Sequence, residues 1–130
     1  MVRLLLAEDD ADMLAVLQTR LESQGWSVEI AANGEEALYK IRTSSFDAVL
    51  LDAVMPLQDG FKVLKALRSD PKTKLLPVLI LSSSEETLEQ AGRKLYPADK
   101  RVFLVEPLGF QELVSKITEV TGDGKTGDSG

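Results

Sequence analysis

The chain has 130 residues, of which 44% are apolar and 28% charged, with a formal net charge of −6 at pH 7. These values are typical of one folded domain and exclude a disordered or fibrous chain. The acidic balance argues against binding to nucleic acid or to an anionic membrane surface. Because cysteine and histidine are absent, disulfides, thiolate or imidazole metal sites and histidine-based catalysis are excluded. Any chemistry must therefore use carboxylates, hydroxyls, amines or the backbone.

The short apolar run at residues 1–6 is followed at once by three acids, Glu8, Asp9 and Asp10. This run is too short, and too quickly followed by charge, to be a signal peptide or a membrane-spanning helix. Together with the lack of cysteine, it favours a cytoplasmic location.

Apolar runs of strand length alternate with segments of helical periodicity along the chain. The expected strands are 2–7, 26–31, 48–51, 78–81 and 102–105. The expected helices run from the acids at 10–12 to Gly25, over 35–43, from Gly60 to before Asp70, and over 85–96 and 110–120. This alternation predicts an α/β domain with a parallel sheet covered on both faces. The domain occupies residues 1–121, and the Gly, Asp and Ser-rich segment 122–130 is expected to be a flexible tail or linker.

Polar side chains stand directly after four of the expected strands. They are Glu8, Asp9 and Asp10 after the first, Asp52 after the third, Ser82 after the fourth and Glu106 after the fifth. Ligands of open parallel sheets bind outside the carboxyl ends of the strands. Several carboxylates at one rim raise one another's pKa or require a cation, and Mg²⁺ prefers oxygen ligands of this kind. Taken singly, however, an acid just after a strand is commonly a helix cap or a solvated loop residue.

Four segments carry a family resemblance. In chain order they are LLLAEDDADM, FDAVLLDAVMPLQDG, LPVLILSSS and FLVEPLGFQEL. They resemble the receiver domains of two-component response regulators, of the CheY-like superfamily. The resemblance implies a doubly wound (βα)₅ fold with the flavodoxin-like strand order 2-1-3-4-5. It also implies a phosphoacceptor signalling domain rather than an enzyme.

The resemblance assigns Asp52 as the phosphoacceptor, which takes a phosphoryl group from a histidine kinase or phosphotransfer protein. It assigns Mg²⁺ to Glu8, Asp9, Asp52 and the main-chain carbonyl of Val54. It further implies that Ser82 is the switch hydroxyl that donates to the phosphoryl group. Such a reaction is covalent catalysis by a carboxylate, with a metal neutralising charge during the transfer.

The resemblance also places a switch aromatic at Phe103, for which an ordinary core position is an equal alternative. Pro107 would follow a cis peptide bond, which proline alone adopts at low cost. The downstream partner would dock on the face of the fourth helix, fifth strand and fifth helix, with the domain a monomer or a weak homodimer.

One residue departs from the family pattern: Glu106 stands where the family has a lysine. Two unit charges about 4 Å apart interact by about 4 kcal/mol at an effective dielectric constant near 20, so reversing this charge is energetically large. Two functions therefore remain open. One is a working phosphoacceptor, because Glu8, Asp9, Asp52 and Ser82 are retained. The alternative is a degenerate receiver that serves as a phosphorylation-independent docking module.

Overall fold

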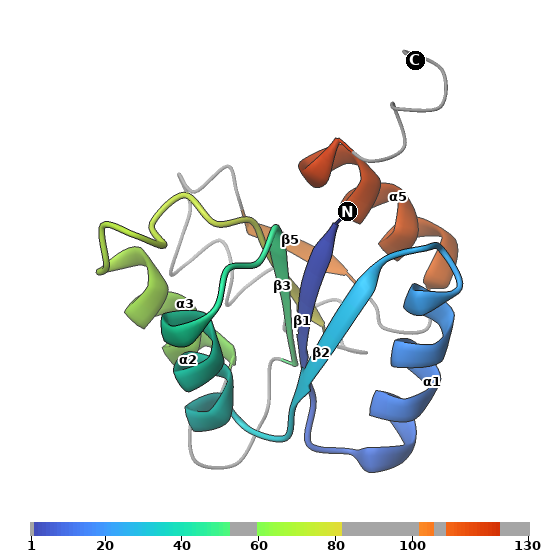
Figure 1. Cartoon of the computed structure of the whole chain (residues 1–130), viewed down its shortest axis with the longest axis horizontal. Helices are drawn as coiled ribbons and strands as arrows, with labels where there is room; N and C mark the ends of the chain where they lie inside the picture. Colours follow the sequence, from blue (N-terminus) through green and yellow to red (C-terminus); the bar gives the residue numbers. More distant parts are fainter. Residues whose placement is uncertain (1, 53–59, 82–101, 106–108, 123–130) are drawn as a thin grey trace.

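The fold is taken from a computed structural model, which describes residues 2–52, 60–81, 102–105 and 109–122. For Phe61 and residues 102–105 it describes the backbone only. Helices cover both faces of a central sheet, so the domain has three layers (Figure 1).

The sheet is parallel, with the strand order β2-β1-β3-β4-β5. Its strands are β1 (Arg3–Ala7), β2 (Ser27–Ala31), β3 (Ala48–Asp52), β4 (Val78–Leu81) and β5 (Val102–Val105). Each pairs in parallel with its neighbours in this order. The order reverses direction at β1, because β2 lies on one side of β1 and the later strands lie on the other. Ligand sites of doubly wound sheets lie near such a reversal, at the carboxyl ends of the strands.

Four helices are described: α1 (Ala11–Glu22), α2 (Gly34–Thr43), α3 (Gly60–Arg68) and α5 (Phe110–Thr121). Helix α2 begins with a reciprocal cap. The Asn33 Oδ1 atom accepts from the Glu36 N–H at 2.8 Å, and Glu36 Oε1 accepts from the Ala32 N–H at 2.6 Å. These bonds satisfy N–H groups that a helix start leaves without intrahelical partners. The Asn33-Gly34 pair, which reads as a turn in the sequence, is therefore the cap and first residue of α2.

Alternate side chains of each central strand pack on opposite faces of the sheet. Leu5, Ala7, Val49 and Leu51 face one cluster, which also contains Leu64 and other residues of α2 and α3. Leu4, Leu6 and Leu50 face a second cluster with Leu17 and Leu21 of α1 and Leu113 and Ile117 of α5. Burial on both faces explains why β1 and β3 are continuous apolar runs rather than alternating ones.

The structure confirms the α/β class and the parallel sheet that the sequence predicts. Helix α1 ends at Glu22, three residues before Gly25, which has a positive φ of 90°. The expected helix at 85–96 and all of the expected tail 122–130 except Gly122 lie outside the described residues. None of the helices in the described part of the chain has the length and apolar character that a membrane-spanning segment needs.

Candidate functional site

The strand register brings two acids together at the carboxyl end of the sheet. Ala7 of β1 is paired with Leu51 of β3, so the next residues, Glu8 and Asp52, stand at the same level of adjacent strands. The Glu8 N–H also donates to the Ala31 carbonyl at 3.0 Å, which ties this residue to β2. The backbone therefore fixes Glu8 from two strands at the point where the strand order reverses.

Carboxylate oxygens of Glu8, Asp9 and Asp52 all lie within 4.8 Å of one another. Glu8 is buried with 6% of its surface exposed, Asp52 is half-buried and Asp9 is exposed. The family resemblance assigns these three side chains, together with the Val54 carbonyl, to Mg²⁺. The oxygens converge from the ends of two strands, and their residues range from buried Glu8 to exposed Asp9. The cluster is therefore open to solvent on one side.

Burial raises the pKa of the Glu8 carboxyl from 4.5 to about 8. A hydrogen bond with the Asp52 side chain and the negative charge of Asp52 add to the effect, as does a hydrogen bond with Asp9. The Asp10 N–H opposes it by donating to Glu8 Oε2 at 3.2 Å. Repulsion between the acids is thus real, as the sequence predicts, but removal of Glu8 from water is the larger cause.

Asp10, the third acid of the run, has a different role. Its carboxylate caps α1 by accepting from the Asp12 N–H at 2.9 Å and the Met13 N–H at 3.2 Å. A carboxylate in this position also interacts favourably with the helix dipole. Of the three consecutive acids, Glu8 and Asp9 therefore converge with Asp52, whereas Asp10 caps α1.

Most of the other predicted site residues belong to segments outside the described part of the chain. Val54, Ser82, Glu106 and the predicted cis bond before Pro107 lie outside the described residues, and of Phe103 only the backbone is described. The strands that precede Ser82 and Glu106, β4 and β5, are described. Leu81 at the end of β4 pairs with Asp52 of β3 on one side and with Val105 of β5 on the other. Strand β4 thus ends beside Asp52, one residue before Ser82.

The donor set fits a hard divalent cation. All three side chains offer carboxylate oxygens, which Mg²⁺ prefers, and a partly open rim leaves room for the waters that it retains. Metal ligands must be deprotonated, so a cation that bound next to Asp9 and Asp52 would displace the proton that the buried Glu8 carboxyl holds.

Comparison with known proteins identifies the family. Residues 4–118 match the sequence model of the response regulator receiver domain family, so the chain belongs to this family. The receiver domain of the Francisella response regulator 1452 is 29% identical, with a TM-score of 0.79 over 96% of this chain and 100% of that one. The response regulator TrrA from Thermotoga maritima, solved in complex with Mg²⁺-BeF, is 28% identical with a TM-score of 0.79, covering 92% of this chain and 99% of that one.

A receiver domain with magnesium coordinated in its active-site cleft is also similar. It belongs to the sensor histidine kinase PA1611 of Pseudomonas aeruginosa and is 25% identical, with a TM-score of 0.80 over 94% of this chain and 98% of that one. Among curated sequences, the CpxR homolog of Haemophilus influenzae is 36% identical over 121 residues, which cover 92% of this chain and 50% of that protein. The chain spans about half the length of the curated relatives that it matches.

Proposed function

We propose that this receiver domain accepts a phosphoryl group on the Asp52 carboxylate, with Mg²⁺ held by Glu8, Asp9, Asp52 and the Val54 carbonyl. The observation that carries the proposal is the convergence of the Glu8, Asp9 and Asp52 oxygens within 4.8 Å at the carboxyl end of the sheet. Asp52 is the acid best suited to be the acceptor. It ends a buried strand, so its backbone is held rigidly, and it remains half-buried rather than enclosed.

In the transfer, an Asp52 carboxylate oxygen attacks phosphorus and forms an O–P bond while the P–N bond of a phosphohistidine breaks. The electron pair of that bond returns to the imidazole nitrogen of the donor. A bound Mg²⁺ would neutralise charge on the transferring oxygens. Glu8 would contribute in both of its protonation states. When protonated, it lowers the electrostatic repulsion around Asp52, and when ionised, it provides a ligand for the metal.

Three further residues complete the proposal. Ser82 would donate its hydroxyl to the phosphoryl group, and Phe103 would be the aromatic that responds to this movement. Glu106 would add a fourth carboxylate at the rim in place of the family's lysine. We infer that the cation then carries most of the positive charge that transfer needs, which makes phosphorylation of this domain strongly dependent on Mg²⁺.

The partners follow from the family. A histidine kinase or phosphotransfer protein would be the phosphoryl donor, in the cytoplasm, and a downstream protein would dock on the face of α5, β5 and the helix expected at 85–96. The domain would act as a monomer or weak homodimer and as a signalling module rather than as an enzyme.

The test is incubation with Mg²⁺ and acetyl phosphate, followed by intact mass spectrometry. We expect one phosphoryl adduct on the wild-type protein, none on Asp52→Asn and an unchanged adduct on Asp12→Asn. Asp12 is an exposed acid in the first turn of α1, so this control removes the same charge without touching the cluster.

Absence of an adduct, under conditions that label another receiver domain, would refute the proposal.

Glu106 is the specific feature that favours the second candidate, a phosphorylation-independent docking module. In that case Asp52→Asn would leave both partner binding and signalling output unchanged.

A further inference from the structure

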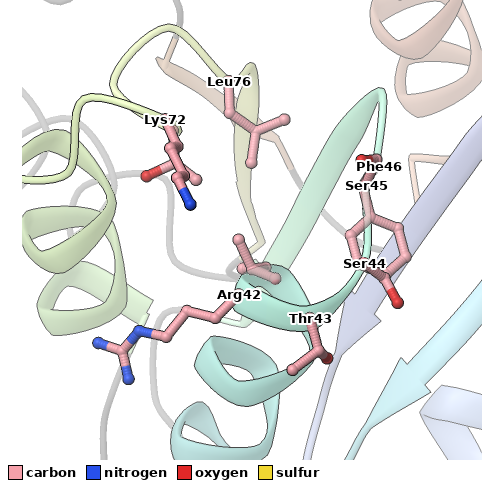
Figure 2. A pocket seen from close by; sticks show the side chains of 9 residues that line it. Arg42, Thr43, Ser44, Ser45, Phe46, Lys72 and Leu76 are labelled. Atoms are coloured by element: carbon pink, nitrogen blue, oxygen red, sulfur yellow. The ribbon is translucent and has the colours of Figure 1, made fainter.

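A cavity of about 360 Å³ lies at the end of the sheet opposite the acidic cluster. One wall is the end of α2 and the loop before β3, and the other is the segment that leads into β4 (Figure 2). Phe46 comes two residues before β3 begins, whereas Asp52 ends that strand. Six residues of extended chain span roughly 20 Å, so this cavity and the acidic cluster are separate sites.

Two cations line the cavity, Arg42 from α2 and Lys72 from the segment before β4. Both side chains are exposed. Within the described part of the chain, neither forms a side-chain hydrogen bond or an ion pair. The acids nearest to the cavity in sequence, exposed Asp47 and half-buried Asp70, do not line it. Asp47 accepts from the Arg3 N–H at 2.7 Å, and the Asp70 carboxylate accepts from the Lys72 backbone N–H at 2.9 Å.

The cavity also offers hydroxyl groups and an apolar surface. Ser44 and Ser45 line it, and their hydroxyls form no hydrogen bond with other described residues. Phe46 and Leu76 are partly buried against the core beneath α2 and α3, and both also line the cavity. Figure 2 shows Leu76 and Lys72 on one wall and the run from Arg42 to Phe46 on the other.

We propose that this cavity binds a small organic anion, with its charged group held by Arg42, Lys72 and the serine hydroxyls and its apolar part against Phe46 and Leu76. Two observations carry the proposal. In a chain of net charge −6, two cations that pair with no other described residue line one concave space, and apolar side chains line the same space. Ligand sites typically combine an apolar lining with a few polar groups, and about 300 Å³ is enough for a small ligand.

The test uses phenylphosphonate, whose phosphorus is bonded to carbon and cannot be transferred to Asp52. Amide chemical shifts of the whole chain are followed by NMR without Mg²⁺, so that no cation bridges the probe to the acidic cluster. A fragment of this size binds with a dissociation constant on the order of 1 mM, and the titration should reach about 10 mM. We expect saturable shifts at the amides of residues 43–46 and 73–76.

Three variants and two further probes decide the outcome. Arg42→Gln and Lys72→Gln should each weaken binding by about 5-fold or more, because hydrogen bonds to charged groups are the stronger ones. Lys65→Gln removes an exposed charge from α3 that does not line the cavity, and binding should be unchanged. Inorganic phosphate, which has no apolar part, and benzyl alcohol, which has no charge, should both bind more weakly.

The proposal would be overturned by non-saturable shifts, by shifts located elsewhere, or by equal weakening in Lys65→Gln. Equal affinity for inorganic phosphate would show a simple ion site and would exclude the organic anion. None of these results depends on phosphorylation of Asp52, so the two proposals can fail separately.

Discussion

Titration of the protein with Mg²⁺ at several pH values tests the role of the buried Glu8 carboxyl. As a proposed Mg²⁺ ligand, Glu8 would have to be ionised, whereas in the metal-free protein burial raises its pKa to about 8. One proton with this pKa leaves Glu8 ionised in about 1% of molecules at pH 6, about 9% at pH 7 and about half at pH 8. The apparent affinity for Mg²⁺ should therefore rise about 9-fold from pH 6 to 7 and about 5-fold from pH 7 to 8.

Isothermal calorimetry in buffers of different ionisation enthalpy measures both the affinity and the protons released. We expect release of about 0.9 proton per Mg²⁺ at pH 7 and about half a proton at pH 8. An affinity that does not change between pH 6 and 8, with no proton released, would refute the reasoning. It would mean that Glu8 is already ionised in the metal-free protein or is not a ligand.

The raised pKa of Glu8 also predicts how the stability of the metal-free protein changes with pH. Between pH 4.5 and about 8, the folded protein holds a proton on Glu8 that the unfolded chain has lost. The free energy of unfolding should therefore fall as pH rises through this window. One pKa unit corresponds to about 1.4 kcal/mol, so the loss from this group is at most about 5 kcal/mol. Under the proposed function, Mg²⁺ should restore stability at pH 8, because the three acids that would bind it converge only in the folded state.

Glu8→Gln is the decisive variant for this linkage, because the amide keeps the shape of the side chain and carries no charge. The variant should unfold at a higher denaturant concentration than the wild type at pH 8 without metal. Its Mg²⁺ affinity should be weaker and nearly independent of pH. Glu22→Gln, at the exposed end of α1, is the matched control and should retain the wild-type pH dependence.

Three other predictions concern packing, capping and turnover. Leu50→Ala removes a fully buried side chain from β3 and should lower the free energy of unfolding, measured by chemical denaturation, by about 2–5 kcal/mol. Its control, Val16→Ala on the exposed surface of α1, should change this free energy by less than about 0.5 kcal/mol. Asn33→Ala removes the cap of α2 and should cost about 1 kcal/mol, with Asn33→Asp close to neutral as its control. Val54→Asn should shorten the lifetime of phosphorylated Asp52, measured by intact mass over time, because an amide there can orient the attacking water and valine cannot; an unchanged or longer lifetime would contradict this.

The acidic cluster shows where prediction from sequence succeeds and where it stops. The rim itself can be selected in advance, because acids follow apolar strands there and parallel strands present their carboxyl ends at one edge. The choice of Glu8, Asp9 and Asp52 from those acids comes from the family resemblance. The different role of Asp10 is not visible in the run of acids. It depends on where α1 begins, and either Asp10 or Asp12 could have capped that helix.

The sequence by itself determined the α/β class, the bounds of most strands and helices and the edge of the sheet that carries the acids. These features follow from periodicity and from residues that are near one another in the chain. Only the tertiary structure decided that Glu8 is buried enough to hold a proton near neutral pH, and that Arg42 and Lys72 face one cavity. Both depend on register and packing between segments that are distant in the chain, which no local pattern encodes.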